Sequence, residues 1–192
     1  YSGVQVELRE VDLKDIPDSL RALVPDNPTV PVLQLPDGRV IDESWDILLW
    51  AVRENDPDGW LGKDECNLVP AEQWIEMNDF SFKTDLDHYK YHERYPEQTQ
   101  LEYRTEAEEF IQDLENRLQG GRFLLGDKLS IADIGVLPFV RQFAFVDKDW
   151  FDQAPYPQVQ AWLADFLESD LFTSVMEKYP VWAVGDDPVV FG

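Results

Sequence analysis

The pattern of apolar and polar residues over the first forty-one positions predicts a strand, a short helix and a hairpin. Residues 4–13 alternate like a half-buried strand, with a slip near Glu10 and an inward set of Val4, Val6, Leu8 and Val11. Pro17 lies near the first turn of a short helix within residues 14–24, which the proline-containing residues 25–28 end. Apolar runs at 30–35 and 39–41 flank Pro36-Asp37-Gly38, a turn signal, and so predict a hairpin.

A helix is predicted directly after the hairpin, because Ile47, Leu48, Trp50 and Ala51 have the spacing of one buried helix face. Residues 55–70 are rich in Asp, Gly and Pro and indicate a connector. From residue 71 onward the pattern is helical. The strand, short helix, hairpin and helix before the connector therefore form one group, and the helices after it form another.

The second group contains two long helices and two shorter ones, besides a helix that begins after Ser130. The first long helix runs from Ala71 to a stop at Pro96, with a buried stripe of Trp74, Ile75, Phe80, Phe82 and Leu86. The second covers residues 99–119, faces inward with Leu101, Phe110, Leu114 and Leu118, and ends at Gly120-Gly121. Shorter helices follow at 156–168 and 170–178. The apolar tail 181–192 packs either along the helices or beside a pocket, and the pattern leaves both open.

The junction between hairpin and helix, Asp42-Glu43-Ser44, carries the first candidate chemistry. A helix start offers unpaired N–H groups and the positive end of the dipole, which attract a carboxylate. Ser44 is a natural N-cap residue, and an ionised Glu43 accepts hydrogen bonds from an ammonium group. The junction therefore suits the head of an α-amino acid. On residue types alone, the structural interpretation, in which Ser44 caps and Glu43 complements the dipole, is favoured.

A second motif starts the segment Leu129-Ser130-Ile131-Ala132-Asp133-Ile134. Ser130 is placed to cap a helix while Asp133 reaches back to it, and Leu129 and Ile134 occupy the two positions of a hydrophobic staple. We therefore interpret Asp133 as a structural residue rather than a catalytic one.

Charge and cysteine content narrow the classes of partner and compartment. The 192 residues include 39 acidic and 16 basic side chains, a net charge of −23, which disfavours nucleic acid and anionic membranes as partners. Cys66 is the single cysteine, so no internal disulfide is possible and a reducing compartment fits. No apolar run of about 18 residues and no signal peptide is visible, and we predict a cytoplasmic protein.

Two other candidate sites are weak. His88 and His92 are four residues apart and would share a helix face, but no third ligand cluster supports a metal, and we predict none. Cys66 follows Asp64 and Glu65, and these acidic neighbours disfavour a thiolate.

The order Thr-Val-Pro-Val-Leu, turn, Val-Ile-Asp-Glu-Ser and helix strongly resembles the glutathione S-transferase superfamily, in its cytosolic, bacterial type. The motif Leu-Ser-Ile-Ala-Asp-Ile at 129–134 adds to this resemblance. The resemblance implies an α/β thioredoxin-like N-terminal domain and an all-α C-terminal domain. It also implies a cis Pro31, a backbone pairing of Val30 with the cysteinyl part of glutathione, and a γ-glutamyl head held by Glu43 and Ser44.

By this resemblance the protein conjugates glutathione to an electrophile or reduces a mixed disulfide, and forms a homodimer. The implied domains are a glutathione-binding domain at 1–56, a linker at 57–70, a helical domain at 71–180 and a tail at 181–192. An apolar co-substrate would lie against the helices between Trp74 and Tyr103. The alternative is a non-catalytic relative that serves as a protein-interaction module, for which the acidic surface suits a basic partner.

Part of the family pattern has no match in residues 1–192. The family's first strand, most of its first helix and its catalytic Cys, Ser or Tyr would precede Tyr1, so we expect the chain to be a fragment and leave the catalytic residue unassigned. Some members carry a lysine that reaches the glycyl end of glutathione. Ile16 occupies that position here, and Lys14 lies two residues earlier.

Overall fold

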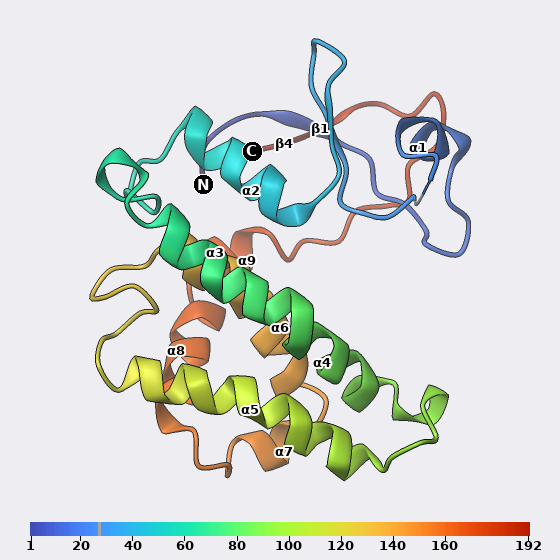
Figure 1. Cartoon of the computed structure of the whole chain (residues 1–192). Helices are drawn as coiled ribbons and strands as arrows, with labels where there is room; N and C mark the ends of the chain where they lie inside the picture. Colours follow the sequence, from blue (N-terminus) through green and yellow to red (C-terminus); the bar gives the residue numbers. More distant parts are fainter. Residues whose placement is uncertain (27) are drawn as a thin grey trace. The chain divides into compact units, whose positions relative to one another are not determined.

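The computed structural model describes residues 1–26 and 28–192, which form two compact units (Figure 1). Unit 1 combines residues 1–58 with residues 176–192, and unit 2 comprises residues 59–175. The predicted break at 25–28 contains residue 27, which lies outside the described residues. No helix within the described residues is both long and apolar enough to cross a membrane.

Unit 1 holds the predicted strand, short helix, hairpin and helix. Its elements are β1 (Val6–Leu8), α1 (Asp18–Leu23), β2 (Leu33–Gln34), β3 (Val40–Ile41), α2 (Ser44–Glu54) and β4 (Val189–Phe191). The alternation in β1 is as predicted, because Val4, Val6 and Leu8 are half-buried and Gln5 and Glu7 are exposed, although the strand is shorter than residues 4–13.

The hairpin is confirmed, with Leu33 opposite Ile41 and Gln34 opposite Val40. The N–H of Gly38 donates to the carbonyl of Leu35 (2.9 Å), and the N–H of Leu35 donates to the carbonyl of Arg39 (2.8 Å). Gly38 has φ +89°, a conformation that glycine adopts without a Cβ penalty. Pro36-Asp37-Gly38 is thus a three-residue loop with glycine at its left-handed position, which is what the turn signal predicts.

The C-terminal tail belongs to unit 1 and pairs with β1, a position that the sequence analysis did not consider. β4 runs antiparallel to β1, with Val6 opposite Phe191 and Leu8 opposite Val189. The N–H of Trp182 donates to the carbonyl of Glu10 (2.9 Å), and the Arg9 guanidinium lies 4.6 Å from the centre of the Trp182 ring. The tail therefore covers an edge of β1.

The buried face of α2 differs from the predicted one. Leu49 and Val52 are the buried residues, at 8% and 2% exposure, whereas Ile47, Leu48, Trp50 and Ala51 are only half-buried. Apolar residues occupy most positions from 47 to 52, so the helical period alone does not fix the inward face.

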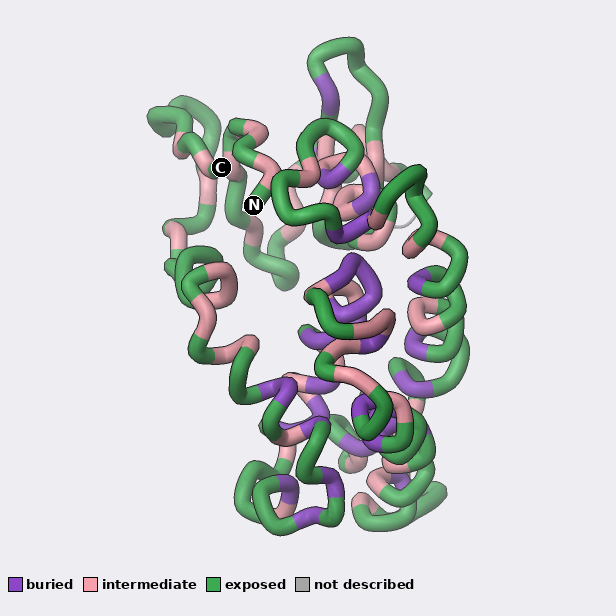
Figure 2. Tube along the Cα trace, turned by 90° about the vertical axis from the view of Figure 1, so that its left-hand side faces the viewer, coloured by how far each residue is buried: buried purple, intermediate pink, exposed green. Residues whose placement is uncertain are grey.

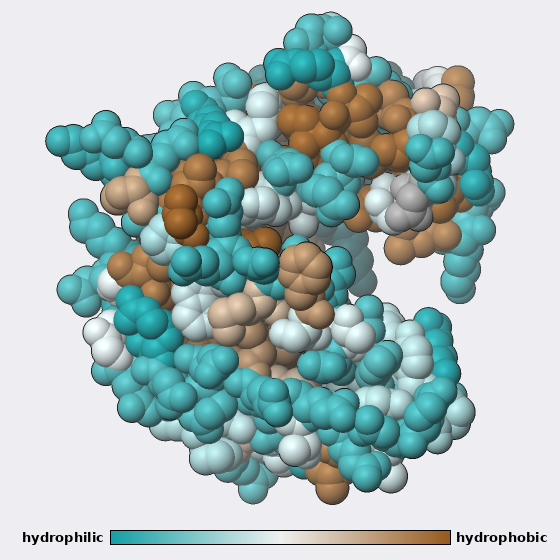
Figure 3. Space-filling model, in the orientation of Figure 1, coloured by the Kyte–Doolittle hydropathy of each residue, from teal (hydrophilic) through white to brown (hydrophobic). Residues whose placement is uncertain are grey.

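Unit 2 is helical as predicted. Its elements are η1 (Lys63–Glu65), α3 (Leu68–Met77), η2 (Asn78–Phe82), α4 (Lys83–Lys90), η3 (His92–Arg94), α5 (Gln100–Leu118), α6 (Ile131–Ala144), α7 (Lys148–Phe151), α8 (Pro157–Leu167) and α9 (Asp170–Ser174). The predicted helix from Ala71 to Pro96 is broken at Tyr91, the last helix ends at Ser174 rather than at 178, and η1, η3 and α7 were not predicted. Buried residues gather on the turns where these helices face one another (Figure 2). The face seen in Figure 3 is mainly hydrophilic, in keeping with the net charge of −23, and carries several apolar patches (brown).

Two predicted core positions in unit 2 are wrong. Phe80 is 81% exposed, because η2 is a π-helical turn whose extra residue rotates the following side chains relative to the α-helical pattern. Phe82, two residues later, is fully buried and stacks on Phe110 with ring centres 4.5 Å apart. Leu101 is 58% exposed in the first turn of α5, although Phe110, Leu114 and Leu118 face inward as predicted.

Asp133 is the centre of a buried network at the start of α6. Its carboxylate accepts hydrogen bonds from the N–H of Leu124 (2.9 Å), the N–H and hydroxyl of Ser130 (3.0 and 2.6 Å) and the indole N–H of Trp162 (3.0 Å). Ser130 is the N-cap of α6. The structural interpretation of Asp133 therefore accounts for all of its contacts.

Candidate functional site

The start of α2 provides the candidate site, and its N-cap is Glu43. The N–H of Ile47 donates to the carbonyl of Glu43 (2.9 Å), which is the first intrahelical bond of α2. Ser44 is therefore the first residue of the helix, and the predicted N-cap at Ser44 is wrong by one position. The N–H groups of residues 44–46 have no intrahelical acceptor, since they lie in the first turn.

The side chains at this helix start are available to solvent. Glu43 and Ser44 are exposed, and neither side chain makes a hydrogen bond within the described part of the chain. The arrangement presents a carboxylate, a hydroxyl and free N–H groups on one short stretch. Such a site can hold a zwitterion, with an ammonium at Glu43 and a carboxylate at the helix start.

The hairpin brings Val30 and Pro31 to the same end as this helix start. Pro31 lies two residues before β2 and Glu43 two residues after β3, so both flank the end of the hairpin away from its turn. The Val30–Pro31 bond is cis, as the resemblance implies, and Val30 is 43% exposed. The structure thus places the four residues singled out from the sequence at one end of the hairpin.

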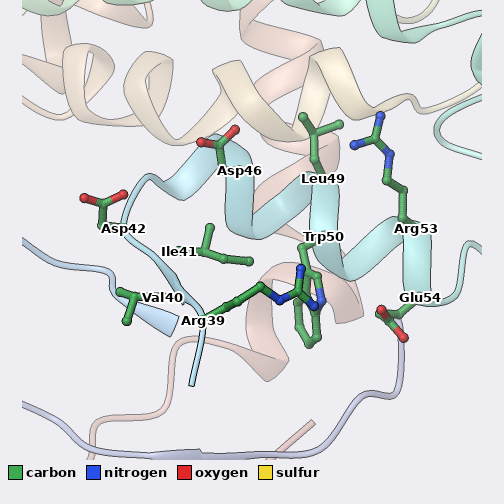
Figure 4. Close-up of a pocket in the computed structure, with 9 residues that line it drawn as sticks. All are labelled: Arg39, Val40, Ile41, Asp42, Asp46, Leu49, Trp50, Arg53 and Glu54. Carbon is green, nitrogen blue, oxygen red and sulfur yellow. The ribbon is translucent and has the colours of Figure 1, made fainter. Parts of the chain in front are cut away.

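A cavity of about 520 Å³ adjoins this junction, between the second hairpin strand and α2 (Figure 4). Its lining residues are Arg39, Val40, Ile41, Asp42, Asp46, Leu49, Trp50, Arg53 and Glu54. Arg39 is paired with Asp37 (2.8 Å), and the N–H and guanidinium of Arg39 hold the pKa of Asp37 below its ordinary value. The sequence interpretation missed this cavity, because it assigned Trp50 to the core and gave Arg39 no role.

The predicted histidine pair is not brought together. His88 lies in α4 and His92 in η3, and the intervening Tyr91 has non-helical angles, so the two do not share one helix face. The His88 ring instead lies 4.2 Å from the ring of Tyr95 and 5.0 Å from that of Tyr103. Among the residues that the structure describes, no group of three or more His, Cys, Asp or Glu is arranged to hold a metal ion. Cys66 is exposed.

Comparison with known families assigns both parts of the chain. Residues 1–54 match the glutathione S-transferase N-terminal domain, and residues 66–165 match the glutathione S-transferase C-terminal domain. The chain belongs to the glutathione S-transferase family. At the level of this family the protein is a glutathione transferase enzyme, with a thioredoxin-like domain followed by a helical domain.

Individual relatives of this glutathione S-transferase are distant in sequence. It is 25% identical over 188 residues to a glutathione S-transferase of Emericella nidulans, with 93% of this chain and 69% of the relative covered. Among solved structures, it is similar to the ternary complex of BphK, a bacterial glutathione transferase, with a TM-score of 0.73, 22% identity and coverage of 90% of this chain and 86% of that one.

Another similar structure is a glutathione transferase of Burkholderia graminis with two glutathione molecules bound per subunit. It has a TM-score of 0.65 and 24% identity, with coverage of 80% of this chain and 68% of that one. At these identities the two structures support the fold, and the roles of individual residues rest on the geometry of the junction.

Proposed function

We propose that this transferase binds glutathione at the start of α2 and uses it either to conjugate an electrophile or to reduce a mixed disulfide. The observation that carries the proposal is the exposed pair Glu43 and Ser44 at a helix start, with neither side chain hydrogen-bonded within the described residues. The glutathione-binding part is residues 1–56, followed by a linker at 57–70, the helical domain at 71–180 and the tail at 181–192, which pairs with β1.

Each group at the junction has a separate part of glutathione to hold. The γ-glutamyl end is an α-amino acid, so its ammonium binds the Glu43 carboxylate and its carboxylate binds the N–H groups and the Ser44 hydroxyl at the helix start. Val30, preceding Pro31 at the same end of the hairpin, offers its backbone to the cysteinyl part. An apolar co-substrate lies against the helices between Trp74 and Tyr103.

The test is titration calorimetry with glutathione on Glu43→Gln and, as a matched control, Asp42→Asn. Each variant removes one exposed carboxylate, and the two positions are adjacent in the sequence. Only Glu43→Gln removes the proposed partner of the glutathione ammonium group. We expect Glu43→Gln to weaken binding by about 10–100-fold, as for loss of a charge-assisted hydrogen bond, and Asp42→Asn to leave it nearly unchanged.

A ligand without the ammonium group separates this role from a general effect of charge. N-acetylglutathione should bind the wild-type protein weakly and should lose little more affinity in Glu43→Gln. Equal losses for glutathione and N-acetylglutathione, or a lowered melting temperature with unchanged affinity, would assign Glu43 a structural role instead.

We also propose that the protein is a homodimer. Exposed apolar side chains along α3 and η2 support this, since Val69, Met77 and Phe80 are 64%, 39% and 81% exposed. Light scattering after size-exclusion chromatography should give the dimer mass for wild type. Phe80→Ser should shift the equilibrium toward monomer, whereas Leu101→Ser, which removes an exposed apolar side chain from α5, should not. A monomeric wild-type protein at micromolar concentration would contradict the proposal.

A further inference from the structure

Unit 2 contains a second cavity, which the proposed glutathione site does not use. It has a volume of about 170 Å³ and lies among the loop before α6, α6 itself, α8 and the start of α9. Apolar side chains form most of its lining, namely Phe123, Leu129, Leu137, Trp162, Phe166 and Leu171, and Arg122, Asp165 and Ser169 supply the polar part. An apolar cavity of about 150 Å³ in another protein stays dry and binds benzene, so this volume fits a ligand of one or two rings.

The floor and one wall of the cavity are rigidly held. Leu137 is fully buried in α6, and Trp162 is 4% exposed. The indole N–H of Trp162 donates to Asp133 (3.0 Å), whose carboxylate is held in turn by Ser130 and Leu124. The same network that starts α6 therefore fixes the orientation of the Trp162 ring. A preformed wall lowers the cost of ordering on binding.

The polar residues of the cavity indicate whether its ligand is charged and where it can form a hydrogen bond. Arg122 pairs with Asp165 through Nη2 and Oδ2 (3.1 Å), so their opposite charges largely compensate each other, and both side chains are more than half exposed to solvent. Ser169 is already engaged, because its hydroxyl donates to the carbonyl of Phe166 and accepts from the N–H of Phe172. Oδ1 of Asp165 makes no hydrogen bond within the described part of the chain. One solvent-exposed acceptor is therefore left beside the apolar lining.

We propose that this cavity binds a compact, uncharged aromatic molecule that carries one hydrogen-bond donor. The rings occupy the space between Trp162, Phe123 and Phe166, where aromatic faces and edges pair favourably, and the donor reaches Asp165. Indole and simple phenols belong to this chemical class. The site lies in the helical unit, and the proposal does not depend on glutathione binding at α2.

The first experiment is calorimetric titration of the whole protein with indole, with and without saturating S-hexylglutathione. We expect one indole per chain and the same affinity in both conditions, because S-hexylglutathione carries both the glutathione part and an apolar group of the kind that a co-substrate offers. Displacement of indole by S-hexylglutathione would overturn the proposal by assigning indole to the co-substrate site. A failure of glutathione binding would leave the indole titration interpretable, so the two proposals fail separately.

Cavity-filling variants test the location. Leu129→Trp and Leu171→Trp fill the space from opposite sides and should each weaken indole binding by about tenfold or more. Leu125→Trp is the matched control, since Leu125 is half-buried in the same loop as Leu129 but does not line the cavity. Thermal melting identifies any variant that does not fold, and the second variant then carries the test. Folded Leu129→Trp and Leu171→Trp proteins with wild-type affinity would overturn the proposal.

The donor is tested with 1-methylindole, which has the same rings and no N–H. It should bind about fivefold more weakly than indole to wild type, and the difference should vanish in Asp165→Leu. Equal binding of the two ligands by the wild-type protein would overturn the role given to Asp165.

Discussion

Asp133 illustrates how one buried side chain organises a domain. It is fully buried and accepts four hydrogen bonds, from Leu124, Ser130 and Trp162. Its position was predictable, because Ser130 and Asp133 are spaced as a capping motif. The hydrogen bonds from Leu124 and Trp162 to Asp133 were not predictable, because these residues are 9 and 29 positions away and lie outside the local capping motif.

Replacing Asp133 by Asn should destabilise the protein. The Asn amide keeps one acceptor oxygen. In place of the second carboxylate oxygen it has an NH₂ group, which points a donor at the donors that this oxygen binds in the wild-type protein. We expect the free energy of unfolding at pH 7 to fall by about 2–3 kcal/mol, measured by urea denaturation. Asp127→Asn, at an exposed position in the same loop, should change it by less than about 0.5 kcal/mol. Equal effects of the two variants would mean that the network contributes little.

The pH dependence of this difference has a definite sign. Burial raises the pKa of Asp133 above its ordinary value of 3.8, against the opposing effect of its hydrogen bonds. The folded state therefore binds the Asp133 proton more tightly than the unfolded state. That contribution to stability is complete below about pH 4 and is lost as the pH rises through the raised pKa. The stability difference between wild type and Asp133→Asn should thus shrink from pH 3.5 to pH 7, and a difference that grows would contradict the raised pKa.

At the candidate site, sequence reasoning identified Val30, Pro31, Glu43 and Ser44, and their ligand roles stay predictions. The turn and the helix start are local signals, so the hairpin and α2 could be located. The sequence prediction placed the N-cap at Ser44 because serine is the commoner capping residue. In the structure, the first backbone hydrogen bond of α2 makes Glu43 the N-cap.

At the scale of elements, a long-range contact supplies what α8 lacks locally. The N-cap of α8, Tyr156, makes no capping hydrogen bond with its side chain, and Pro157 has no N–H. The N–H groups of Gln158 and Val159 donate to Glu115 of α5 (2.9 and 3.0 Å), whose side chain is buried. The carboxylate of one helix therefore caps the start of another.

Removing this carboxylate should be costly. Glu115→Ala leaves the N–H groups of Gln158 and Val159 without their acceptor, and we expect a loss of about 2–4 kcal/mol in the free energy of unfolding. Glu115→Gln keeps one acceptor oxygen and should lose less. Glu109→Ala, an exposed glutamate on the same helix, is the control and should fall within about 0.5 kcal/mol of wild type. Indistinguishable denaturation curves for the two alanine variants would contradict the capping role.

In the long helical segment between residues 68 and 90, the sequence pattern predicted the helix but not its irregular turn. The π-helical turn at Asn78–Phe82 was not predictable, because no residue type signals an extra residue in a helix. The apolar spacing assigned both Phe80 and Phe82 to the core, and only Phe82 is there. Phe82 is the buried one because it packs against Phe110 and Phe143, which are far from it in the sequence and which the local pattern therefore could not indicate.

For the whole molecule, the net charge of −23 is the dominant global property. Mutual repulsion of the carboxylates opposes compactness, and salt screens it. We expect the melting temperature at pH 7 to rise by about 3 °C between 50 and 500 mM sodium chloride, which corresponds to about 1 kcal/mol. The rise should diminish as the pH approaches 4 and carboxylates become protonated. A melting temperature that falls with salt at pH 7 would mean that attractive ion pairs outweigh the repulsion.

The division into two units was only partly accessible from the sequence. A change from alternating to helical periodicity near residue 70 separates the two groups of elements. The pairing of the tail with β1 could not be predicted, because an exposed strand edge can pair with any extended segment and the sequence does not specify which one.

The pairing of β1 with β4 also sets the order in which the chain can assemble. Val6 and Phe191 are opposite each other, although 185 positions separate them along the sequence. Closing so long a loop over an unfolded chain costs more entropy than closing it once residues 59–175 have folded and drawn the two ends of the intervening segment into a compact body. We therefore expect unit 2 to fold first and the two-stranded pair to form last. In pulse-labelling hydrogen exchange, the amides of β4 would then gain protection after those of α5 and α6.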